Sequence, residues 1–141
     1  MRFTHRFAAA LALLLVPFAA GCRGGLGSPR TTAGESAIAQ LRTINTAEAA
    51  YLASHDHYAC TMAELGSQFG LIDRDLSYGQ KDGYYFNLKC PPAKGVPTYQ
   101  AWASPVETGL GGHSFYCTDQ TGAIRRASGR IEDCGDASPV N

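Results

Sequence analysis

The sequence predicts an α+β fold, in which one long N-terminal helix packs on an antiparallel meander of three or four strands. Three observations lead to this prediction. A long helical pattern stands alone before residue 60, most of the glycines and prolines come after it, and apolar residues alternate with polar ones in the later segments. Helices and strands that are segregated along a chain in this way are typical of α+β domains.

The composition is that of a globular protein. The chain has 141 residues, of which 45% are hydrophobic and 17% are charged, and its formal net charge is zero. This length suits one domain, and this balance is unlike that of a disordered chain. No basic stripe with interleaved aromatic residues occurs, so we expect no nucleic-acid partner.

Residues 1–21 are predicted to be a lipoprotein signal peptide. Two arginines within the first six residues precede an uninterrupted apolar run of ten, from Phe7 to Val16. Such a run is typical of a secretory signal and is too short to span a bilayer comfortably. Its end at Gly21-Cys22 resembles the lipobox of bacterial lipoproteins, which implies a diacylglyceryl group on Cys22. An ordinary signal peptide with a coincidental cysteine is the alternative.

Residues 22–31 are predicted to be the lipidated cysteine and a flexible tether. Residues 23–30 contain three glycines, a serine and a proline without an apolar period. At about 5 to 6 Å times the square root of its length, such a tether spans roughly 15 Å. The domain would thus stay close to a membrane of the cell envelope and face the periplasm or the exterior. Arg23 after the cysteine favours the outer membrane, if the organism sorts lipoproteins by that residue.

The long helix is predicted between Thr32 and His57. Thr32 and Glu35 have the spacing of a capping box, in which both side chains satisfy free backbone N–H groups at a helix start. After this cap, apolar residues recur at the spacings of one helical face: Ile38, Leu41, Ile44, Ala47, Tyr51 and Leu52. One apolar stripe predicts a core-facing helix of about 20 to 24 residues.

The later elements are predicted from capping and turn residues. Thr61 and Glu64 repeat the capping-box spacing, which predicts a short helix over 62–69. Residues 71–76 are predicted to add a helical turn, and residues 79–83 have turn chemistry.

Strands are predicted where aromatic and β-branched runs alternate or flank turn residues, namely over 84–90, 98–104, 113–118 and 123–126. The α+β domain is accordingly predicted over 32–134. Residues 135–141 are predicted to be a mobile C-terminal tail.

Four cysteines remain when Cys22 is assigned to lipid, and they predict two disulfides. An even number in an exported chain favours disulfides, and spacings of 30, 27 and 17 supply no close pair for zinc. Three pairings are possible. We favour Cys60–Cys90, which closes a loop between helix and sheet, with Cys117–Cys134, which pins the C-terminal segment onto a late strand.

Four stretches of the sequence together resemble a known family of proteins: residues 41–51, 58–60, 82–86 and 114–125. They resemble the globular head of type IV pilin-like and pseudopilin-like proteins of acidobacterial and myxobacterial type. The resemblance implies a helix cradled by an antiparallel sheet and a disulfide-closed loop near the C-terminus. Pilins also carry a long apolar N-terminal helix, which the lipoprotein signal and tether replace here. Filament assembly by that route is therefore not expected.

The sequence contains no nucleophile-elbow, phosphate-loop, dinucleotide or zinc-protease motif, so we expect no enzyme activity and no cofactor. The densest polar cluster is His55-Asp56-His57. Together with His113 it would serve the alternative function of a metal-binding protein or enzyme. Within a helix, His55 and His57 point about 200° apart. We therefore predict no metal site, and we explain the two histidines by their place at a helix C-terminus.

The aromatic residues of the strands suggest a binding surface. If alternation places Tyr85, Trp102 and Tyr116 on the sheet face away from the helix, they form an exposed patch suited to protein or glycan contact. The alternative is that loops cover them. The predicted function is a non-catalytic, lipid-anchored binding or structural protein with a protein partner in the cell envelope. A second hypothesis is an accessory subunit of a type IV pilus or a type II secretion-like machine.

Overall fold

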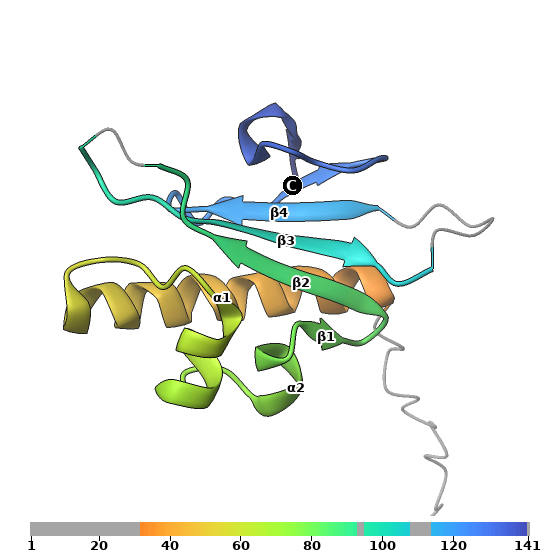
Figure 1. Ribbon diagram of the computed structural model, residues 1–141. Helices are drawn as coiled ribbons and strands as arrows, with labels where there is room; N and C mark the ends of the chain where they lie inside the picture. Colours follow the sequence, from red (N-terminus) through yellow and green to blue (C-terminus); the bar gives the residue numbers. More distant parts are fainter. Residues whose placement is uncertain (1–31, 93–94, 108–113, 141) are drawn as a thin grey trace, which may run out of the picture.

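The computed structural model describes residues 32–92, 95–107 and 114–140. Within them, one long helix crosses one face of an antiparallel sheet. Two short helical segments pack against each other, the first beside the long helix and the second beside the first strand (Figure 1). No helix in these ranges is long and apolar enough to cross a membrane. The predicted signal peptide, Cys22 and the tether lie outside the described residues.

The long helix, α1, spans Ala33–His55 and has 23 residues. Its predicted capping box is confirmed. The Thr32 hydroxyl accepts a hydrogen bond from the backbone N–H of Glu35 (3.2 Å), and the Glu35 carboxylate accepts one from the backbone N–H of Thr32 (2.8 Å). The helix ends where Asp56 adopts the left-handed conformation, with φ of 60°.

Two short helical segments follow α1. A π-helical segment, η1, spans Glu64–Gln68, and the α-helix α2 spans Arg74–Ser77. Thr61 and Glu64 form the second predicted capping box, since the Thr61 hydroxyl and the Glu64 carboxylate each accept from the other residue's backbone N–H. Both predicted helical turns are therefore present, although the first is wound as a π-helix.

The sheet is a six-stranded antiparallel meander in the order β1-β2-β3-β4-β5-β6. Its strands are β1 Gln80–Lys81, β2 Tyr84–Lys89, β3 Gln100–Pro105, β4 Phe115–Asp119, β5 Arg125–Ala127 and β6 Ser138–Pro139. A 3-10 segment, η2, spans Cys134–Asp136 and precedes β6.

The prediction of a sheet with three or four strands was wrong, because β1 and β6 extend it to six. Each of these edge strands has two residues, which is too short to show alternation in the sequence. β1 falls in the segment predicted as a turn. β6 falls in the segment predicted as a mobile tail, where Ser138 pairs with Arg126 of β5.

The core lies between α1 and the sheet (Figure 1). On α1 it contains Ala37, Leu41, Ile44, Ala47 and Tyr51, and on the strands Tyr84, Phe86, Leu88, Ala101, Ala103 and Tyr116. Small Ala101 and Ala103 are fully buried in β3, the strand that runs through the middle of the sheet. Alanine at these two positions lets the helix approach the sheet closely.

A polar network crosses this core at Asn45 of α1. Its side-chain oxygen accepts from the hydroxyls of Tyr99 (2.7 Å) and Thr118 (3.0 Å), and its amide nitrogen donates to the carbonyl of Gly122 (3.1 Å). A buried polar group is tolerated when its partners are present. The network therefore fixes the middle of α1 relative to β4 and the following hairpin.

Both predicted disulfides are present. Cys60–Cys90 joins the segment after α1 to the end of β2, and Cys117–Cys134 joins β4 to η2. The Cα atoms of the two pairs lie 5.0 and 5.7 Å apart. The favoured pairing among the three possible ones is thus confirmed.

Candidate binding site on the outer face of the sheet

The sheet face opposite α1 carries two of the three predicted surface aromatics. Trp102 pairs with Asn87 of β2 and with Cys117 of β4, and Tyr85 pairs with Ser104 of β3. Because paired residues point to the same side of a sheet, all of them lie on this outer face. Tyr85 is 50% exposed, and Trp102 is partly buried.

Tyr116 does not belong to this surface, which corrects the predicted patch. It pairs with Ala103, which faces α1, and it is buried in the core. Its hydroxyl comes so close to Gly34 that an added Cβ there would lie 2.7 Å from it. Consecutive aromatic residues 115 and 116 left the alternation of β4 ambiguous in the sequence, and Phe115 occupies the outer face instead.

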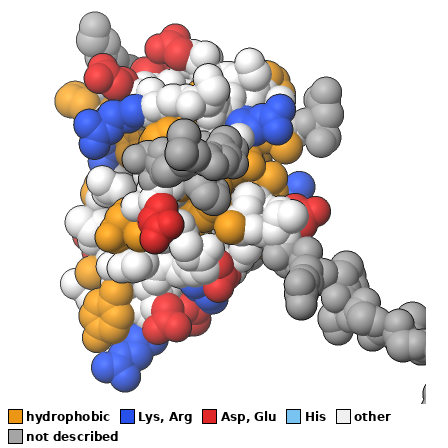
Figure 2. Space-filling model, turned by 90° about the vertical axis from the view of Figure 1, so that its right-hand side faces the viewer, with side chains coloured by type: hydrophobic (Ala, Val, Ile, Leu, Met, Phe, Trp, Pro, Cys, Tyr) orange, Lys and Arg blue, Asp and Glu red, His pale blue; other side chains and the backbone are white. Residues whose placement is uncertain are grey.

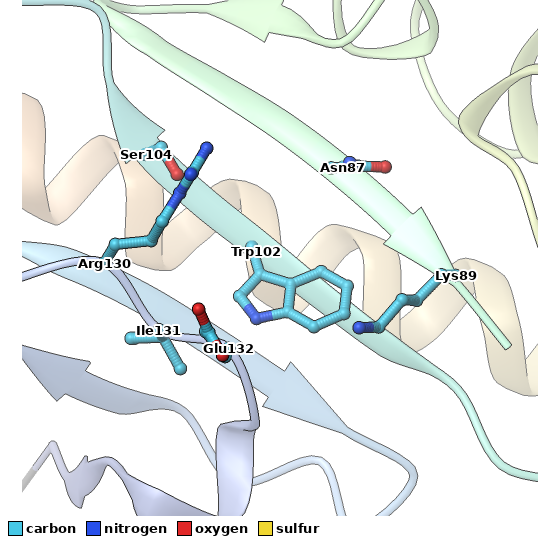
Figure 3. Close-up of a pocket in the computed structure, with 7 residues that line it drawn as sticks. All are labelled: Asn87, Lys89, Trp102, Ser104, Arg130, Ile131 and Glu132. Carbon is cyan, nitrogen blue, oxygen red and sulfur yellow. The ribbon is translucent and has the colours of Figure 1, made fainter. Parts of the chain in front are cut away.

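A groove of about 480 Å³ lies on the outer face. Figure 3 shows the residues that line it: Asn87 and Lys89 from β2, Trp102 and Ser104 from β3, and Arg130, Ile131 and Glu132 from the segment between β5 and η2. We call this the Trp102 groove. Its volume lies within the range of small-molecule sites, about 300 to 1,000 Å³.

Trp102 is held in place by the Cys117–Cys134 disulfide. The two cysteines and Ala137 form a small buried cluster, against which Trp102, Ala127 and Ile131 pack. The disulfide thereby keeps the segment around Ile131 against the sheet, beside Trp102. The indole nitrogen is buried and has no hydrogen-bond partner among the described residues; it lies on the side of the ring that faces Ile131 and Glu132 (Figure 3).

Two cations and one carboxylate line the groove. The Lys89 ammonium lies 4.4 Å from the centre of the Trp102 ring, a cation–π distance. Arg130 and Glu132 approach from the other side of the ring (Figure 3). The ion pairs found in the described ranges are Lys81–Asp73 and Arg125–Asp119, neither of which involves a groove residue. The charges of the groove are therefore available to a ligand.

The charges elsewhere on the surface are mixed. Figure 2 shows a face on which basic and acidic side chains are interspersed with hydrophobic ones. Lys81 is paired with Asp73 at 2.5 Å, and Arg74 lies over the ring of Tyr78, which is 73% exposed. The aromatic ring of Tyr78 thus provides a comparison for Trp102 outside the groove.

The histidines at the end of α1 lie in an aromatic cluster. The His55 ring stacks on Tyr51 at 4.1 Å and meets the edge of Phe69 at 4.6 Å, and the His57 ring lies 6.2 Å from that of His55. Across the described ranges, no three His, Cys, Asp or Glu side chains group as metal ligands. His113, the third residue of the metal hypothesis, lies outside these ranges.

Glu48 is a buried acid that was not predicted as a candidate residue. It is fully buried on α1; one carboxylate oxygen accepts from the backbone N–H of Ala59 (2.9 Å), and the other has no partner in the described part of the chain. Burial, opposed by the Ala59 hydrogen bond and reinforced by Glu64, raises the pKa of Glu48 to about 7. Glu48 lies four residues after Ile44 and three before Tyr51, which places it on the apolar stripe of α1. This spacing could have predicted its burial from the sequence.

Of the seven residues that line the groove, only Trp102 was predicted as a site residue. Asn87, Lys89 and Ser104 were assigned to strands without a binding role, and nothing in the sequence places the 130–132 segment over β3. Only the Cys117–Cys134 pairing hinted that C-terminal residues return to the sheet.

Comparisons of this chain with protein-family models, with curated proteins and with solved structures find no match. The resemblance to pilin-like heads therefore stays a prediction from the sequence.

Proposed function

We propose that this chain is an extracytoplasmic binding protein, anchored to a membrane by lipid on Cys22, that holds its ligand in the Trp102 groove. The observation that carries this proposal is the set of groups in that groove. An aromatic ring, two cations and one carboxylate line one hollow of ligand size, and neither described ion pair uses these charges.

The disulfides support an extracytoplasmic location. Such bonds persist in oxidising compartments and are rare in the cytosol. Cys60–Cys90 and Cys117–Cys134 account for all four cysteines that follow Cys22. They agree with the signal peptide that the sequence predicts.

The polar groups of the groove support a binding role. Asn87 and Ser104 lie beside the Trp102 ring, and side chains of these kinds orient a ligand in a binding site.

The lipid anchor is tested by expressing the full chain and the Cys22→Ser variant in a bacterial host. We expect the wild-type chain in the membrane fraction, with a mass that shows cleavage before Cys22 and an added diacylglyceryl group. The variant should lose both the modification and the membrane association. An intact leader with an unmodified Cys22 thiol in the wild-type chain would contradict the anchor.

The groove is tested by sedimentation of the purified chain in detergent with cell-envelope material. We compare the wild type with Trp102→Phe, which retains an aromatic ring but lacks the indole, and with the double variant Lys89→Gln/Arg130→Gln. The double variant should bind at least tenfold more weakly, because a hydrogen bond to a charged group contributes about 1.5 to 3 kcal/mol.

Tyr78→Phe and Arg74→Gln are the matched controls, since they make similar changes at an exposed aromatic and its cation outside the groove. Thermal unfolding of every variant establishes that it is folded. Equal binding by the groove variants and these controls would refute the proposed site.

A further inference from the structure

The chemistry of the Trp102 groove selects among ligand classes. Lys89 and Arg130 bring two positive charges and Glu132 one negative charge, so the lining is cationic by one unit. Hydrogen bonds between such cations and a carboxylate are about twice as strong as neutral ones. The charge balance therefore favours a ligand that carries an anionic group.

The two cations are positioned differently. The Lys89 ammonium is held over the indole at 4.4 Å, whereas Arg130 extends toward Ser104 from the other side of Trp102 (Figure 3). Carboxylates on the two sides of Trp102 would meet a positioned ammonium on one side and a planar guanidinium on the other. Arginine suits this role because its N–H groups match the two oxygens of a carboxylate.

The uncharged lining is suited to hydroxyl groups. Asn87 offers both a donor and an acceptor, and Ser104 offers a hydroxyl that can act as either. Trp102 provides an apolar ring surface beside these polar groups. A sugar has the matching pattern, with hydroxyl groups around its rim and C–H groups on its ring faces.

A peptide fits the same groove less well. Peptide-binding grooves usually anchor apolar side chains in apolar pockets. Here the lining outside Trp102 is polar or charged except for Ile131, and Ile131 already packs against the disulfide cluster. No apolar pocket within this groove is left to anchor a peptide side chain.

We propose that the Trp102 groove binds an acidic saccharide, whose carboxylates contact Lys89 and Arg130 on the two sides of Trp102 and whose hydroxyl groups contact Asn87 and Ser104. This inference rests on the proposed function, since it names the ligand class of the same groove. The groove volume of about 480 Å³ suits one or two sugar units rather than a long buried chain.

The test uses the fluorescence of Trp102, which is the single tryptophan of the chain and thus reports on the groove alone. The full chain in detergent is titrated with digalacturonate and with the matched neutral disaccharide digalactose. Digalacturonate should change the fluorescence saturably, and digalactose should bind at least tenfold more weakly. Added salt should weaken digalacturonate binding, because salt screens exposed charges.

Lys89→Gln and Arg130→Gln should each lower the digalacturonate affinity about tenfold, whereas Arg74→Gln should leave it unchanged. A short acidic peptide serves as the competing macromolecular class. Equal binding of digalactose, or tighter binding of the peptide, would overturn the saccharide proposal while leaving the groove as a binding site. Groove variants that still bind envelope material as the wild type does would instead refute the proposed function itself.

Discussion

The two faces of the sheet differ in what their residues contribute, although the same strands supply both. On β2, the residues that face α1 are buried, and the alternate residues, Tyr85, Asn87 and Lys89, are exposed. On β3, the inner residues are buried alanines and proline, while Trp102 and Ser104 face outward and are only partly covered. Packing against the helix explains the inner residues. It does not explain a tryptophan between two cations on the outer face, and this difference identifies the outer face as the place to look for function.

The largest effect on the free energy of unfolding is expected from a substitution on the inner face. Leu41 is fully buried between α1 and the sheet. Replacing it with alanine removes buried apolar surface and leaves a cavity, so Leu41→Ala should lower the free energy of unfolding by about 2 to 5 kcal/mol. Urea unfolding followed by circular dichroism measures this change.

Tyr85→Ala is the outer-face counterpart, because Tyr85 is half exposed. It should change the free energy of unfolding by no more than about 0.5 kcal/mol, as is usual for surface substitutions. Similar losses for the two variants would mean that the faces are not distinct in stability.

A somewhat smaller effect is expected at the outer face when its disulfide is removed. Cys117 and Cys134 are 17 residues apart, and in the chain-entropy model a cross-link that closes a loop of about this length contributes roughly 3 kcal/mol. The double variant Cys117→Ala/Cys134→Ala should therefore lower the free energy of unfolding by about this amount.

The same variant should also loosen the groove, since Trp102 and Ile131 pack on this disulfide. Its folded state should show a red-shifted tryptophan emission, because water would reach the indole. The double variant Cys60→Ala/Cys90→Ala provides the control, as that bond follows the C-terminal end of α1 and is not part of the cluster against which Trp102 packs. An unchanged emission after loss of Cys117–Cys134 would contradict the proposed support of the groove.

The sequence predicted the parts of the fold that depend on neighbours along the chain. Thr32 and Glu35 are only three residues apart, so their capping box could be predicted from the sequence. Four strands were placed because alternation or a turn marked each of them. The edge strands β1 and β6 exist only by pairing with β2 and β5, which no local pattern records.

The candidate site was predicted only in part, for a related reason. Trp102 was assigned to a surface because alternation along one strand separates the two faces of a sheet. Tyr116 was misplaced because its neighbour is also aromatic. Arg130 and Glu132 reach the groove through a tertiary contact that the Cys117–Cys134 disulfide stabilises, and their spacing from Trp102 in the sequence carries no information about it.

Glu48 adds to this comparison from the inner face, because it is a fully buried carboxyl in a face that is mostly apolar. Asn45, one turn earlier, has a partner for each side-chain polar atom, whereas Glu48 leaves one carboxylate oxygen without a partner in the described part of the chain. Burial therefore raises the pKa of Glu48 from the ordinary value of about 4.5 to about 7.

The direction of the pH dependence follows from this shift. Below about pH 4.5 the carboxyl is protonated in both the folded and the unfolded chain, so it does not affect stability. Between about pH 4.5 and 7 the unfolded chain releases the proton while the folded chain retains it, and the free energy of unfolding falls as the pH rises. Above pH 7 both forms are ionised, and the loss is complete. At about 1.4 kcal/mol per pKa unit, the loss is at most about 3 kcal/mol, and partial access of water would reduce it.

Glu48→Gln tests this directly, since glutamine can still accept from the Ala59 N–H but cannot ionise. We expect the variant to match the wild type near pH 4.5 and to be more stable by up to about 3 kcal/mol at pH 8, as measured by urea unfolding across this range. Asp73, whose pKa is lowered by its hydrogen bond to Lys81, affects stability in the opposite sense at lower pH, and it cancels in the difference between the two proteins. A difference that does not grow between pH 4.5 and 7 would mean that water reaches Glu48, and the inner face would then be less completely sealed than its apolar neighbours indicate.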